Sequence, residues 1–123
     1  MNSSFMHVRF VILLYTLLAL MACSASDKYD NGQLKERVST FQDKNGNLIK
    51  QGAFIQWYEN GQKKQQGTFV HDRMDGEFYE WYENGQMKSL RRYTNGELNG
   101  VSTWWTEDGH VKSEVDYVDG YRR

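Results

Sequence analysis

The sequence predicts an all-β fold, an extended antiparallel meander of stacked β-hairpins that forms a single-layer, twisted sheet. Glycine, tryptophan and several other residues recur at a spacing of 24 residues along most of the chain. Asn-Gly or Asp-Gly pairs, which favour tight turns, recur roughly every ten residues. After residue 22 the chain holds 15 aromatic residues, only 12 Leu, Ile and Val, and no proline. Regularly spaced glycines among many aromatic residues favour strands and turns over helices.

Six residue columns repeat in strict register across three consecutive units. They are Gly52, Gly76 and Gly100; Trp57, Trp81 and Trp105; Glu59, Glu83 and Glu107; Gly61, Gly85 and Gly109; Lys64, Lys88 and Lys112; and Phe69, Tyr93 and Tyr117. Self-similarity at a fixed period indicates units that stack on one another and bury a continuous core. We therefore expect a repeat domain over 32–123, made of a degenerate unit at 32–51 and full units at 52–75, 76–99 and 100–123.

Each unit carries two turn signals. The first is Asn60-Gly61, Asn84-Gly85 or Asp108-Gly109; the second is Asn95-Gly96 or Asp119-Gly120, with His71-Asp72 as a degenerate copy and Asn45-Gly46 in the first unit. These pairs suit two-residue type I′ turns, in which both residues have positive φ.

A two-residue loop at Asn84-Gly85 fixes the register of its hairpin. It sets Trp81 opposite Lys88, and Gly76 opposite Tyr93, with the same pairs in the other units. A ring that lies over a cross-strand glycine would compensate for the missing side chain. A bulged three-residue loop is the alternative, and it would shift the pairing.

The segment from Tyr93 to Gly100 resembles a MORN repeat, whose core pattern is Tyr-x-(Asn/Asp)-Gly-x-x-x-Gly. The segment from Phe69 to Gly76 is a weaker copy, because Asp72 replaces the turn glycine. The Trp-Tyr-Glu-Asn-Gly-Gln-x-Lys segments are typical of the bacterial MORN variant, often labelled as the YwqK-type antitoxin-like repeat family. The resemblance covers about residues 31–121. It implies a rod or curved sheet of hairpins with roles in protein–protein contact or membrane-adjacent scaffolding, and it implies no enzymatic activity.

Residues 1–22 have the organisation of an export signal, with a short basic region followed by an apolar run that predicts a signal helix. The run ends in Leu20-Met21-Ala22-Cys23, which resembles the lipobox of bacterial lipoproteins. That resemblance implies cleavage before Cys23 and its acylation with palmitate-type chains. The alternative is a plain secretory signal followed by a chance cysteine. Residues 23–31 are then expected to be the lipidated cysteine and a polar tether.

An acylated Cys23 would place the protein in the cell envelope, anchored in the membrane by its lipid. With Ser24 after the cysteine, we expect the outer membrane if the host is Gram-negative. The formal charge is nearly balanced, with 15 Lys and Arg against 16 Asp and Glu, which argues against a nucleic-acid partner.

The tryptophan and lysine columns are the candidate binding face. We favour a non-enzymatic scaffold or protein-binding module whose protein partner is unknown. One alternative is a cell-wall glycan-binding module, because rings two strands apart recur about every 9–10 Å. Another is an immunity-type protein that neutralises a toxin in the envelope. Lysine stems that simply cover the indoles would give the same pattern without a ligand.

No arrangement typical of an enzyme, a metal site or a cofactor site is present in the sequence. The glutamate column repeats in identical surroundings, so nothing separates the pKa values of a catalytic pair. His71 and His110 lie at or beside turns and lack the further ligands that a metal requires. We therefore expect no catalytic residue, no metal and no cofactor.

Overall fold

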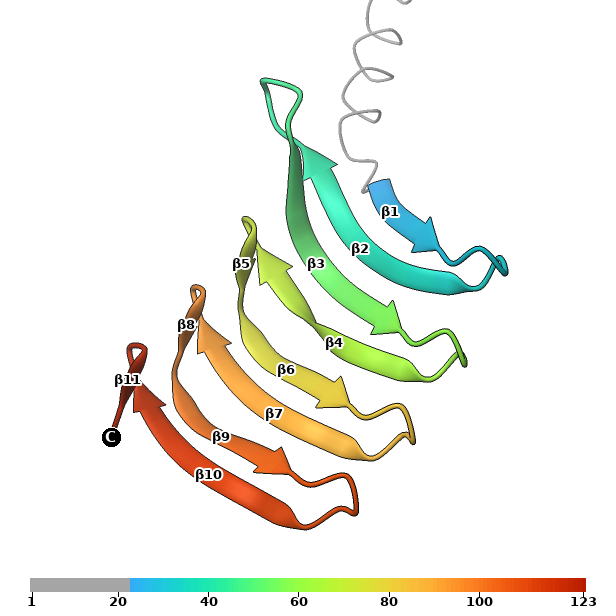
Figure 1. Ribbon diagram of the computed structural model, residues 1–123. Helices are drawn as coiled ribbons and strands as arrows, with labels where there is room; N and C mark the ends of the chain where they lie inside the picture. Colours follow the sequence, from blue (N-terminus) through green and yellow to red (C-terminus); the bar gives the residue numbers. More distant parts are fainter. Residues whose placement is uncertain (1–22) are drawn as a thin grey trace, which may run out of the picture.

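The computed structural model describes residues 23–123, which form one open antiparallel sheet of eleven strands (Figure 1). The strands are β1 (Cys23–Lys28), β2 (Leu34–Gln42), β3 (Leu48–Trp57), β4 (Lys63–Val70), β5 (Arg73–Met74), β6 (Gly76–Trp81), β7 (Met87–Thr94), β8 (Glu97–Leu98), β9 (Gly100–Trp105), β10 (Val111–Val118) and β11 (Tyr121–Arg122). Neighbours in the sheet follow chain order, with β5 and β8 as short strands that pair with β4 and β7. The predicted single-layer meander is confirmed, and the expected signal helix lies outside the described residues.

The segment expected to be a polar tether is a strand along most of its length. Cys23–Lys28 pairs antiparallel with β2, and Ala25 faces Val38. Its small and polar residues satisfy backbone groups of β2 that would otherwise remain open at the sheet edge. The repeat sheet therefore begins at the cysteine, and an anchor on Cys23 would be attached directly to a strand.

The hairpin loops beside the tryptophans have three residues, not the two that the sequence suggests. Gly85 N–H donates to the Tyr82 carbonyl at 2.9 Å, and Tyr82 N–H donates to the Gln86 carbonyl at 2.8 Å. Gly85 has a φ of +87°, whereas Asn84 is not among the residues with positive φ. The Asn84 side chain instead accepts the Gln86 N–H at 2.9 Å, which holds the turn closed.

The same three-residue loop occurs in every unit. Gly61 and Gly109 repeat the hydrogen bonds of Gly85, and so does Gly46, whose Asn-Gly pair therefore belongs with this loop class. After the loops of Gly61, Gly85 and Gly109 a β-bulge follows, so Trp81 pairs with Met87 and not with Lys88. Beyond the bulge the expected pairs return, and Gly76 faces Tyr93.

The loops at the other end of the strands are the two-residue turns that the sequence predicts. Asn95 and Gly96 have φ values of +52° and +90°. His71 and Asp72 adopt the same left-handed conformation at +48° and +64°, although neither is a glycine. The turns also stack between units, because Gly96 N–H donates to the Met74 carbonyl at 2.8 Å.

The buried core lies on one face of the sheet, which we call the phenylalanine face. Val38, Phe54, Phe69 and Phe78 are only 6%, 6%, 8% and 2% exposed there. The Phe54 and Phe78 rings stack with centroids 5.8 Å apart, and Phe69 meets both edge to face. Aromatic rings thus supply the core that the few aliphatic residues cannot.

The glycine that lies under a ring is Gly67, and the prediction that placed Gly76 under Tyr93 is wrong. A Cβ at Gly67 would be 2.2 Å from the Phe78 ring, whereas a Cβ at Gly76 would meet nothing within 4 Å. Gly76 is required instead by its φ of +90°, in the left-handed region that disfavours side chains. Gly52 and Gly100 share this conformation at +103° and +93°.

Candidate binding face

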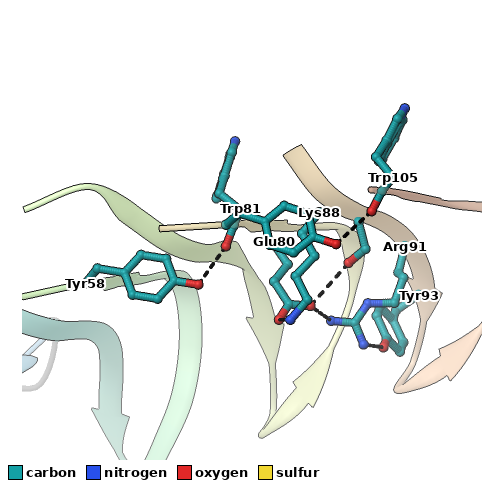
Figure 2. A network of polar contacts seen from close by, with 9 residues as sticks. Tyr58, Glu80, Trp81, Lys88, Arg91, Tyr93 and Trp105 are labelled. Atoms are coloured by element: carbon teal, nitrogen blue, oxygen red, sulfur yellow. Dashed lines mark hydrogen bonds and ion pairs between the residues drawn. The ribbon is translucent and has the colours of Figure 1, made fainter. Parts of the chain in front are cut away.

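The three repeated tryptophans lie on the face opposite the core, which we call the tryptophan face. Trp57, Trp81 and Trp105 end strands β3, β6 and β9, and each is half-buried. Side chains alternate along a strand, so Trp81 and the core residue Phe78 point to opposite faces. Figure 2 shows the Trp81 and Trp105 indoles pointing the same way, with Glu80, Lys88 and Arg91 on the other side of the sheet.

The predicted column of tryptophans facing lysines is wrong, because the bulge turns the lysines to the phenylalanine face. Lys88 Nζ lies 2.9 Å from Glu80 Oε1 and 5.8 Å from the centre of the Tyr82 ring. Lys64 lies over the Tyr58 ring at 5.5 Å. The ammonium group over the Trp81 ring belongs to Lys63, at 5.9 Å. The tryptophans of the predicted face therefore share one face of the sheet: Trp57, Trp81 and Trp105. The lysines lie at the bulges and belong to the phenylalanine face: Lys64, Lys88 and Lys112.

A ladder of tyrosine hydroxyls holds each tryptophan in place from the preceding unit. Tyr58 Oη donates to the Trp81 carbonyl at 2.9 Å (Figure 2), and Tyr82 Oη donates to the Trp105 carbonyl at 2.9 Å. Tyr29 does the same for Trp57. Loop asparagines add a second row, because Asn60 and Asn84 donate to the carbonyls of Glu83 and Glu107 at 3.0 Å.

The residues of this ladder repeat in the sequence, although the sequence does not show what they bond. Tyr58 and Tyr82, and likewise Asn60 and Asn84, are 24 residues apart. The pattern shows only that these residues repeat; that they bond to the next unit follows from the way the hairpins stack. The ladder fixes the backbone at each indole, so the aromatic column is preorganised.

Tyrosine and an ion pair surround the indoles on the tryptophan face. Tyr79 stacks on Trp81 with ring centroids 5.8 Å apart and an interplanar angle of 16°. Hydrogen bonds from Tyr79 and Arg92 lower the pKa of Glu77 below its ordinary value, and the contact with Glu77 raises the pKa of Tyr79. Arg92 Nη2 pairs with Glu77 Oε1 at 3.0 Å and also bonds the Val101 carbonyl from Nη1. The face therefore combines rings with a fixed polar border.

On the phenylalanine face, Glu80 is the centre of a charge cluster. Its two oxygens meet Lys88 at 2.9 Å and Arg91 at 3.4 Å, and Ser89 Oγ lies 3.4 Å away. The hydrogen bond with Glu80 raises the pKa of Lys88. Arg91 also donates to Tyr93 Oη at 3.3 Å. The Glu80 carboxylate is therefore the counter-ion of both Lys88 and Arg91.

The remaining candidates lie apart from one another. Glu59, Glu83 and Glu107 are exposed residues of the three-residue loops. His71 packs edge-on against Phe41 with ring centres 6.0 Å apart. His110 pairs with Asp108 at an exposed loop. Within residues 23–123, no three His, Cys, Asp or Glu side chains gather as metal ligands would.

The same described part of the chain contains no helix long and apolar enough to cross a membrane. No match to the chain was found among curated proteins or among solved structures. The profile of the MORN repeat variant family matches residues 50–71, 74–95 and 98–119. These three consecutive matches cover more than half of the chain and coincide with the hairpin units. MORN repeats are generally non-enzymatic and suggest a protein-binding module. The chain belongs to the MORN repeat variant family.

Proposed function

We propose that this protein is a lipid-anchored, non-enzymatic module of the cell envelope that binds a partner protein through its tryptophan face. The observation that supports this best is the column of Trp57, Trp81 and Trp105. These indoles are half-exposed, in register, and on the face that does not contain the core.

Aromatic side chains are the usual anchors of protein interfaces, because they bury a large area and lose little conformational freedom. Here the tyrosine ladder already fixes the strand ends that carry the indoles. A partner would therefore meet a preorganised surface, which lowers the entropic cost of binding. The neighbouring Glu77–Arg92 pair would supply the polar rim of such an interface.

The proposed site of the lipid anchor is Cys23, which directly follows the apolar leader. Because β1 begins at this residue, lipid on its sulfur would hold the first edge of the sheet at the membrane surface. Cys23→Ala should abolish acylation and move the protein out of the detergent phase on phase partitioning, with Cys23→Ser as the matched variant. Acylation that persists in either variant would refute the lipidated cysteine.

The binding face can be tested with a photo-crosslinking residue placed on each side of the sheet in cells. We expect benzoylphenylalanine at Thr103, which shares the face of Trp105, to give a discrete protein adduct. The same residue at Gln65, on the phenylalanine face, is the matched control. Trp81→Ala should weaken the Thr103 adduct without lowering the amount of folded protein. Equal adducts from both faces, or an adduct unaffected by Trp81→Ala, would contradict the proposed face.

A cell-wall glycan is the second candidate ligand, supported by the spacing of the indoles. Successive tryptophans lie two strands apart, roughly 9–10 Å, which suits rings that stack on alternate units of a polymer. Co-sedimentation of the full chain in detergent with purified sacculi separates the two ligands. Retention that is lost in the Trp57/Trp81/Trp105→Ala variant would indicate a glycan, and no retention would favour the protein partner.

A further inference from the structure

The last unit differs from the others on the phenylalanine face. Ser102 occupies the position of Phe54 and Phe78, and Trp104 occupies the position of Gln56 and Glu80. In the loop that follows, Thr106 replaces the tyrosine of the preceding units. The strand and loop arrangement repeats, so these three replacements change the side chains of the unit and not its backbone.

The replacements remove both partners that hold the equivalent lysine one unit earlier. Lys88 meets the Glu80 carboxylate and the Tyr82 ring. At Lys112 the corresponding residues are Trp104 and Thr106, and no carboxylate of the described residues lies within ion-pair distance of it. Lys112 is therefore a cation beside a half-buried indole, without a counter-ion among the described residues.

Lys112 borders an open hollow of about 310 Å³ on the same face. Trp104, Ser113, Val115 and Tyr117 complete its lining. In the preceding unit the position of Val115 is occupied by Arg91, which contacts Glu80 and Tyr93. The hollow thus offers rings and a valine for an apolar side chain, with a positive charge at its rim.

The backbone beside the hollow is also open. Tyr117 and Val118 of β10 pair with β11, and the Asp116 carbonyl accepts the Arg123 N–H at 2.9 Å. Among the described residues, 111–115 therefore have no strand on their outer side. In the internal units this position is covered: Gln65 faces Glu80, and Ser89 faces Trp104. An uncovered strand edge is a template for an added strand.

We propose that the β10 edge and its hollow bind an extended peptide segment that carries an apolar residue and, two positions later, an acidic residue. The register follows from the β4–β6 pairing, in which Phe78 lies across Gly67 and Glu80 faces Gln65. In the same antiparallel register the apolar residue lies across Val115. Val115 takes up the room that Gly67 leaves for the Phe78 ring, so this apolar residue is smaller than phenylalanine. The acidic residue faces Ser113, next to Lys112, and supplies the missing counter-charge.

The loop of the last unit argues against another MORN unit as the occupant. Units are held together by a tyrosine hydroxyl and an asparagine amide, as between Tyr82 and Trp105. The last loop has Thr106 and Asp108 at these positions, and Thr106 Oγ1 turns inward to accept the His110 N–H at 3.1 Å. The loop therefore lacks both donors, while the strand edge and hollow remain, which suits a single strand.

A peptide of the chain's own residues 75–82 with Phe78→Val is a suitable probe, because it carries a small apolar residue and Glu80 in the required spacing. Binding of the fluorescein-labelled peptide to the full chain in dodecyl maltoside can be followed by fluorescence anisotropy. We expect saturable binding that weakens about two- to fivefold with Lys112→Gln, as for an exposed ion pair. Val115→Arg should weaken it tenfold or more by filling the hollow, and Arg91 shows that arginine is compatible with this column.

Two controls make the outcome specific. Lys44→Gln removes a lysine from a distant exposed loop and should leave binding unchanged, and a peptide with Glu80→Gln should bind wild type and Lys112→Gln equally. Bound peptide should also slow amide exchange in 111–115. The proposal is overturned by absence of saturable binding, by binding that survives Val115→Arg, or by protection elsewhere in the sheet. The tryptophan face is not involved, so Trp81→Ala should leave peptide binding intact whatever the fate of the proposed function.

Discussion

The unit at 76–99 and the unit at 100–123 have the same backbone and very different side-chain support. In the former, Phe78 is 2% exposed and contacts Phe54 and Phe69, and Glu80 holds two cations. In the latter, the same two positions are Ser102 and Trp104. The hairpin geometry therefore depends on turns and glycines, while its stability depends on which residues occupy the phenylalanine face.

The two units therefore differ in what they contribute to the array, either stability or a surface for contacts. Stability in a repeat protein is approximately a sum of unit and neighbour contributions, so one strong centre can support a weaker end. In the last unit, Ser102 Oγ is buried without a hydrogen-bond partner, which a region selected only for stability would avoid. The central units supply stability, and the last unit supplies surface.

The largest expected effect comes from the two equivalent positions of that face. Phe78→Ala should lower the free energy of unfolding by about 3–5 kcal/mol, because it leaves a cavity between two rings. Ser102→Ala should change it by less than about 1 kcal/mol or stabilise slightly, since its hydroxyl has no partner. Urea unfolding of both variants in detergent tests this, and similar losses would show that the two units contribute equally.

A smaller effect is expected from the contact beneath Phe78. Gly67→Ala should destabilise by about 1–3 kcal/mol, because the new Cβ would lie 2.2 Å from the ring. Gly67 is not among the glycines with positive φ, so strain at the backbone does not contribute. In a Phe78→Ala background the same substitution should cost much less. An equal cost in both backgrounds would mean that the ring does not lie over Gly67.

The tyrosine ladder should contribute less per residue. Tyr82→Phe removes the hydroxyl that bonds the Trp105 carbonyl and should cost about 0.5–1.5 kcal/mol. Tyr121→Phe is the matched control, because Tyr121 is 80% exposed and should lose nothing. Thermal unfolding of the two variants measures the difference. Equal melting temperatures would show that the tyrosine ladder does not stabilise the protein.

The smallest expected effect concerns acid. The pKa of Glu77 lies below its ordinary value of 4.5, because Tyr79 and Arg92 bond the carboxylate. A lowered folded pKa stabilises the protein above pH 4.5, and this contribution is lost as the pH falls through the folded pKa. The melting temperature should therefore decrease less for Glu77→Gln than for wild type between pH 5 and pH 3. The group is nearly half exposed, so the change is small.

The fold could be predicted from the sequence because the repeat period and the turns depend on residues that are close together in the chain. The spacing of Gly52, Gly76 and Gly100 gave the period, and Asn95-Gly96 gave a turn with positive φ at both residues, which the structure confirms. The pairing of Gly76 with Tyr93 also followed from counting outward from the loop.

The binding face was predicted less well, since Asn84-Gly85 fits both a two-residue and a three-residue loop. The choice depends on the Tyr82 backbone and the Asn84 side chain, and a one-residue difference moves Lys88 to the other face. The contact of Gly67 with a ring could not be predicted for another reason. Gly67 has no counterpart in its column, where Arg91 and Val115 stand, and its need for space arises from Phe78 on the next strand.

Native-state hydrogen exchange along the array tests the central claim most directly, that stability is concentrated in the units with buried phenylalanines. Gln66 on β4 and Tyr79 on β6 occupy the repeat positions of Glu114 on β10 and Thr103 on β9. We predict that the amides of β4 and β6 exchange at least about tenfold more slowly than those of β9 and β10. Equal protection of the two regions would contradict the division between a stabilising centre and an adaptable end.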